Sequence, residues 1–99
     1  MVKVVRVFAD GSVDDPLCVL RKGNKDQVVW VSEMQCTVEF PVGQNPFGPG
    51  GPANFPIPVG GGVSPPGRPA AAAAVRKYKY MVRDAAGNPL TDPEVDIQN

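Results

Sequence analysis

The sequence predicts an all-β protein, a Greek-key β-sandwich of about seven strands with a long loop rich in proline and glycine. Several segments alternate apolar and polar residues with a period of two, which is typical of strands that bury one face. Turn-forming residues separate these segments at short intervals, as in other sandwiches. No segment is a convincing helix, and the 99 residues suit one domain, which we expect to span residues 1–99.

The first forty residues contain four of the expected strands. Residues that favour strands fill them, and Asp, Asn, Gly and Pro mark the turns between them. We expect these strands at residues 2–8, 17–20, 27–32 and 36–40. The last one alternates most clearly, because Cys36, Val38 and Phe40 share one face while Thr37 and Glu39 share the other. This pattern predicts that Cys36 begins a half-buried strand.

Composition changes sharply in residues 41–69, which we call the Pro/Gly-rich segment. Nine prolines and eight glycines fill its 29 residues, and Arg68 carries its only charge. Proline removes donors from a sheet ladder and glycine weakens a strand, so long regular strands are not expected here. Residues 54–62 alternate apolar residues with proline, which predicts an edge strand or a polyproline II stretch packed on the sandwich. A loop of this length in a small domain is usually functional or disordered.

The last third of the chain returns to strand-like sequence. Five alanines at residues 70–74 favour helix, but the run is too short to be stable alone, so we expect a spacer with one turn. In residues 78–83 the side chains of Tyr78, Tyr80 and Val82 share one face. A short terminal strand is expected at residues 94–98.

Charge and hydropathy exclude several classes of partner. Ten basic and ten acidic residues cancel without forming a long run of either sign, whereas nucleic-acid binding needs clustered Lys and Arg. No apolar run approaches the roughly 20 residues of a membrane span. Lys3 and Arg6 interrupt the apolar N-terminal stretch, so it does not resemble a signal peptide. The sequence as written predicts a cytoplasmic protein, or an exported one if it is the mature form of a processed precursor.

The region around residues 20–40 resembles the cupredoxin family, the small copper-binding sandwiches, near their first metal ligand. In that family a glycine-containing turn leads into a Val-x-Trp strand, a short loop and then His-Thr-Val-x-Phe. The matching residues of this chain are Lys22, Gly23, Val28 and Trp30, and Cys36, Thr37 and Val38 stand where the family has His-Thr-Val. The resemblance implies a cupredoxin-like sandwich.

A second stretch, residues 78–87, resembles the family's Tyr-x-Tyr-x-Cys strand before the ligand loop. Tyr78 and Tyr80 match, but Val82 stands where the copper thiolate belongs. A blue-copper centre needs two imidazoles and a thiolate, usually with an axial thioether, and this sequence contains no histidine. We therefore expect a cupredoxin-like protein without the copper site and without a cofactor.

Cys36 has two interpretations. Soft ligands select Cu(I), so Cys36, Met34 and Cys18 are candidate ligands of an unusual metal or redox site. Cysteine is also a small and often buried apolar residue, and Cys36 shares its face with Val38 and Phe40, which favours packing. In the cytosol both thiols are expected to stay reduced, whereas in an exported protein they could pair.

The sequence contains few residues that could catalyse a reaction. Without histidine, Ser-His-Asp and Cys-His arrangements are impossible, and zinc hydrolase motifs are absent. The paired carboxylates at Asp14 and Asp15, and at Asp92 and Glu94, lie beside prolines in turn-like sequence, where carboxylates cap backbone donors. We expect a protein that is not an enzyme.

The Pro/Gly-rich segment suggests binding to another protein. Proline-rich chains lose little entropy on docking, so they suit extended recognition. We expect a small accessory subunit that docks onto a larger protein complex, or onto further copies of itself. The expected contact residues are Phe47, Phe55, Ile57 and Val59. Two alternatives remain: the segment wraps its own sandwich and covers an open edge, or the sandwich binds a carbohydrate or small ligand with Trp30, Tyr78 and Tyr80.

Overall fold

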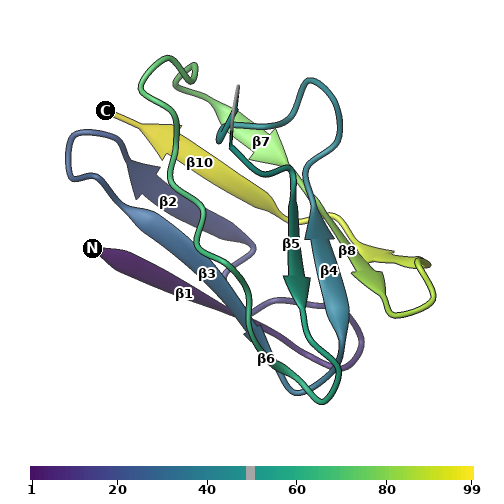
Figure 1. The fold of residues 1–99 in the computed structure, drawn as a ribbon. Helices are drawn as coiled ribbons and strands as arrows, with labels where there is room; N and C mark the ends of the chain where they lie inside the picture. The colour runs from purple at the N-terminus through teal and green to yellow at the C-terminus, as the bar shows by residue number, and fades with distance from the viewer. Residues whose placement is uncertain (49–50) are drawn as a thin grey trace.

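The described residues form a β-sandwich of ten strands (Figure 1). The computed structural model describes residues 1–48 and 51–99, and within these residues no helix is present. The strands are β1 (Val2–Val7), β2 (Leu17–Arg21), β3 (Gln27–Ser32), β4 (Cys36–Glu39), β5 (Asn54–Ile57), β6 (Gly62–Val63), β7 (Lys77–Lys79), β8 (Met81–Asp84), β9 (Pro89–Thr91) and β10 (Glu94–Gln98). The predicted all-β class is confirmed.

The strands pair in three ladders. Their orders are β1-β3-β6, β2-β10-β7 and β5-β4-β8-β9. The pairs β1–β3 and β2–β10 are parallel, and every other pair is antiparallel. Only Tyr80 separates β7 from β8, so the second and third ladders join there. Two parallel strands must be joined by a crossover connection. The connection from β1 to β3 contains β2, which pairs in a different ladder.

All seven expected strands are present. The described residues contain ten strands rather than seven for two reasons. The expected strand at residues 78–83 is divided at Tyr80, whose N–H donates to Pro93 O at 3.0 Å. The short strands β6 and β9 were not predicted, because Gly62 and Pro89 do not favour strands; they exist through pairing with β3 and β8. The alanine run contains one turn, in which Ala73 N–H donates to Ala70 O, as predicted.

Five aromatic rings fill the centre of the sandwich. Their centroids lie 5.0 to 5.9 Å apart in mostly tilted or edge-to-face pairs, the arrangements that aromatic quadrupoles favour. The rings belong to Trp30, Phe40, Phe47, Phe55 and Tyr80, and none is more than 3% exposed. Trp30 Nε1 donates to the Tyr80 hydroxyl oxygen at 3.2 Å, which gives both buried polar atoms a partner.

The Pro/Gly-rich segment wraps its own sandwich. Its strand β5 pairs with β4 at the end of a ladder, which confirms the predicted edge strand. Further along, Ser64 N–H donates to Trp30 O, and Ser64 Oγ accepts from Trp30 N–H. Gly67 and Val28 then exchange two backbone hydrogen bonds. The described residues of the segment therefore cover the edge of β3, in agreement with the first alternative raised from the sequence.

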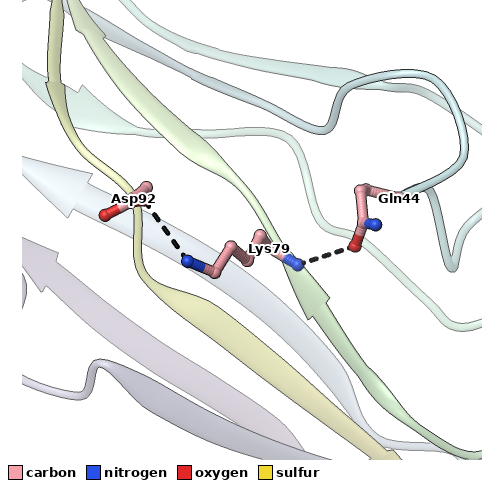
Figure 2. Close-up of polar contacts among 3 residues, drawn as sticks. All are labelled: Gln44, Lys79 and Asp92. Atoms are coloured by element: carbon pink, nitrogen blue, oxygen red, sulfur yellow. Dashed lines mark hydrogen bonds and ion pairs between the residues drawn. The ribbon is translucent and has the colours of Figure 1, made fainter.

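The start of the segment also covers the outer edge of β7. Figure 2 shows Lys79 between Gln44 and Asp92. Lys79 N–H donates to Gln44 Oε1 at 3.0 Å, so an edge donor of β7 is satisfied by a side chain. The Lys79 Nζ–Asp92 Oδ2 pair, at 3.5 Å, is largely exposed and adds little stability. Arg76 Nη2 donates to Gly43 O at 2.8 Å, which also holds the loop that contains Gln44 against the sandwich.

Replacing Phe55 by alanine should destabilise the fold severely. Phe55 is fully buried among three other rings, and such a deletion costs about 3–5 kcal/mol, which approaches the whole stability of a small domain. Urea unfolding measures the loss. Val59→Ala, at an 81% exposed position of the same segment, is the control and should change stability by less than about 0.5 kcal/mol. Equal small effects of both substitutions would contradict the placement of Phe55.

Candidate functional site

The four expected docking residues do not share one surface. Phe47, Phe55 and Ile57 belong to the protein's own core, with exposures of 3%, 0% and 1%. Their burial corrects the expectation that they present a surface to a partner. They are buried because the Pro/Gly-rich segment packs inward through its large apolar side chains. Val59 is 81% exposed and is the one residue of the four that a partner could reach.

Val59 lies in a tight turn against the β3–β4 loop. Gly61 N–H donates to Pro58 O at 2.9 Å. Gly60 and Gly61 have φ values of 84° and 89°, which residues other than glycine rarely adopt. A Cβ on Gly61 would lie 2.6 Å from Ser32 O. The turn therefore needs glycine for both its conformation and its close packing, and Val59 projects from a fixed position.

Ser32 holds the other side of this region. Its Oγ donates to Val7 O at 2.8 Å, at the end of β1, and accepts from Met34 N–H at 3.2 Å. A groove of about 460 Å³ lies between residues 6–9 and residues 31–34. We call this surface the loop-end groove; it lies at the lower end of the sandwich in Figure 1, where β1, β3 and β5 finish.

Phe8, which is 45% exposed, is the most exposed large apolar residue that lines the loop-end groove. Arg6 and Glu33 contribute one charge of each sign. Sequence reasoning missed this site. One available signal was the alternation of residues 2–8, which places Phe8 on the same outward face as Val2 and Val4 rather than with buried Val5 and Val7.

Both cysteines are free, buried and protonated. Burial, helped by the charge of Asp15, raises the pKa of Cys18 to about 12. Burial also raises the pKa of Cys36, and a hydrogen bond with Ser32 opposes the shift only in part. Metal binding and thiol exchange both need the thiolate, so these environments favour packing over chemistry.

The residues around Cys36 do not fit a copper centre. Cys36 begins β4 as predicted, and Val82, in the place of the family's thiolate, lies opposite Val38 with both side chains fully buried. Met34 packs against the core from its edge. In residues 1–48 and 51–99 no three His, Cys, Asp or Glu side chains group as metal ligands. A carbon-lined site with one protonated thiol offers neither the imidazoles nor the thiolate that the blue-copper geometry requires.

The aromatic residues considered for ligand stacking are also internal. Trp30, Tyr78 and Tyr80 are 0%, 4% and 1% exposed. The Tyr78 hydroxyl donates to Ala74 O at 2.8 Å, and the Arg76 guanidinium lies 3.9 Å from the Tyr78 ring centroid. The ring faces therefore contact protein groups rather than solvent.

Comparison with known proteins identifies the architecture. No family model and no curated protein sequence matches the chain. Two solved structures of amicyanin match it, a methionine-to-alanine mutant with Cu(I) and the reduced Cu(I) form at pH 4 of a proline-to-glycine mutant. Each has a TM-score of 0.62 and 18% identity, over 96% of this chain and 80% of the amicyanin chain.

The fold is cupredoxin-like. At 18% identity the match describes the architecture alone. It confirms the resemblance inferred from residues 20–40 and 78–87, while the ligand positions of this cupredoxin-like chain hold residues that do not fit copper. The described part of the chain has no helix long and apolar enough to cross a bilayer.

Alkaline pH should destabilise the protein, in part through Cys18. Its pKa is 9.0 when exposed and about 12 when folded, so between these values the unfolded chain binds fewer protons than the native state. The contribution of Cys18 to the free energy of unfolding is therefore complete below pH 9 and decreases as the pH rises toward 12. Denaturant unfolding from pH 7 to 11 measures the slope, which one group can steepen by up to about 1.4 kcal/mol per pH unit.

Cys18→Ala is the matched variant for this prediction. It lowers stability at neutral pH by leaving a small cavity, but it should also flatten the alkaline slope. Tyr80 and Cys36, whose pKa values burial also raises, preserve the remaining slope. An unchanged slope in Cys18→Ala would contradict the buried, protonated state of this thiol.

Proposed function

We propose that this protein is a non-catalytic accessory subunit that binds a larger protein assembly through the loop-end groove. One observation carries the proposal: Phe8, 45% exposed, lines the groove, and the turn that carries Val59, 81% exposed, packs through Gly61 against Ser32 and Glu33 of the groove wall. Exposed apolar side chains beside a concave surface are typical of protein interaction sites. The Ser32 hydrogen bonds and the Gly61 contact hold both loops in place, which lowers the entropy lost on binding.

The charges around the groove favour a protein partner over a nucleic acid. Arg6 and Glu33 balance each other, and the chain as a whole has a formal net charge of zero. Nucleic-acid surfaces need several unpaired cations along one face. A neutral rim around apolar side chains instead resembles the composition of protein interfaces.

The carboxylates support a role without catalysis. Asp10 accepts hydrogen bonds from Ser12 N–H and Oγ, and these lower the pKa of its carboxyl group. Asp84 accepts from the N–H groups of Ala86 and Asn88, which lowers its pKa in the same way. General acid catalysis needs a raised pKa in a cleft, whereas both groups are ionised turn caps on the surface.

Removing the two apolar side chains should release the partner. We expect the protein, isolated under gentle conditions from its own cell, to have a native mass well above 10.5 kDa. The double variant Phe8→Ser with Val59→Ser should shift most of the protein to the monomer mass, because both side chains are lost from the interface. Native mass spectrometry measures the distribution.

Val42→Ser is the control for this experiment. Val42 is fully exposed and belongs to the same Pro/Gly-rich segment, but it follows β4 whereas Val59 follows the antiparallel β5, so the two lie at opposite ends of the sandwich. This variant should keep the partner. A wild-type protein found only at 10.5 kDa, or equal release by Val42→Ser, would refute the proposed role of the groove.

A further inference from the structure

The outer edge of β1 is open over residues 2–5. β1 ends its ladder and pairs only with β3 among the described residues, and Figure 1 shows it at the border of the sandwich. Near its C-terminal end the edge is closed: Arg6 N–H donates to Asp14 Oδ1, and Arg6 O accepts from Asp14 N–H. Val7 also forms a bridge with Val13.

The contacts of Arg6 show which backbone groups remain available. Its N–H and C=O point away from β3, toward Asp14. Because the direction of these groups alternates along a strand, the N–H and C=O of Val4 and Val2 point to the same side. In the described part of the chain no strand or bridge pairs with this side of residues 2–5.

Apolar side chains accompany the open edge. Val2 and Val4 are 54% and 56% exposed on the outer face of the sheet. The register places Val29 beside Val4, and Val63, which is 58% exposed, pairs with Val31, the neighbour of Arg6, further along the same sheet. An exposed apolar edge strand with free backbone groups is the template for addition of another strand.

We propose that residues 2–5 of β1 bind an extended, acidic segment of a partner protein by strand addition. Lys3 is the one charged residue of the open residues 2–5, the strands β1, β3 and β6 carry no carboxylate, and Asp14 lies at the closed end of the edge, beside Arg6. Apolar residues of the added strand contact Val2 and Val4, and a carboxylate lies opposite Lys3. This surface is separate from the loop-end groove, so the inference goes beyond the proposed function.

Charge also argues against a second copy of this chain as the added strand. Antiparallel self-pairing across the open residues places Val2 opposite Val4 and Lys3 opposite Lys3 of the other copy. Like charges directly opposite destabilise a strand pair. A register shifted by two residues toward the C-terminus separates the lysines but pairs Val2 with Arg6, whose backbone groups Asp14 already occupies.

Two synthetic peptides test the proposal on the purified protein. The probe is a capped six-residue peptide that alternates valine and glutamate, and its control alternates valine and lysine. Amide hydrogen exchange by NMR is the readout. The glutamate peptide should slow exchange at Val2 and Val4 by about tenfold or more, because their outward N–H groups gain acceptors. Lys3 and Val5, whose N–H groups face β3, should change little.

Two variants separate strand addition from other binding. Val4→Pro removes an outward donor without removing a hydrogen bond to β3, and proline is tolerated at such edge positions. It should abolish the slowing at Val2, whereas Val4→Thr, which keeps the N–H and the branched side chain, should preserve it. Lys3→Glu should reverse the preference of the protein between the two peptides, so that the lysine peptide binds in place of the glutamate peptide.

Several outcomes would overturn the inference. These are equal slowing by both peptides, slowing by neither, retained binding in Val4→Pro, and peptide contacts confined to Phe8 and Val59. Slowing that appears without peptide as the protein concentration rises would identify a second copy as the occupant instead. Because this experiment needs no cellular partner, its failure leaves the test of the loop-end groove untouched.

Discussion

Packing of five aromatic rings in the core holds the three ladders of the sandwich together. Trp30 comes from β3, Phe40 follows β4, Phe55 comes from β5, and Tyr80 joins β7 to β8. The rings therefore connect all three ladders, either within strands or next to them. Large rings bury more area than other side chains, and the hydrogen bond from Trp30 to Tyr80 removes the penalty of burying their polar atoms.

The cluster also explains the unusual composition of residues 41–69. Phe47 and Phe55 anchor the segment in the core, and a Cβ at Gly67 would lie only 3.0 Å from atoms of both rings. Glycine allows the backbone to pass close to the rings, and proline limits the freedom of the unfolded chain at little cost where no ladder donor is needed. A segment that resembles a linker in composition thus acts as part of the wall of the sandwich.

Cys36 and Val82, which the sequence resemblance aligns with copper-ligand positions of the cupredoxin family, serve packing in this chain. Cys36 and Val82 lie on paired strands with fully buried side chains, and burial keeps the thiol protonated. The two surfaces that we propose for binding are the groove at the ends of β1 and β3 and the open edge of β1. Both sites rely on the same strand, which presents Val2, Val4, Arg6 and Phe8 outward while Val5 and Val7 join the core.

The fold class and most strand positions follow from the amino-acid sequence alone, because a period of two shows directly which residues of a strand are buried. Val38, Tyr78, Val82 and Ile97 all face inward as their patterns predict. The role of Phe47, Phe55 and Ile57 follows from the three-dimensional packing, because the alternation of residues 54–57 shows that Phe55 and Ile57 share a face but not whether that face meets this chain's own core or a partner. The tertiary structure also decided which edges stay open, because strand order results from contacts between residues far apart in the chain, and local sequence carries no record of them.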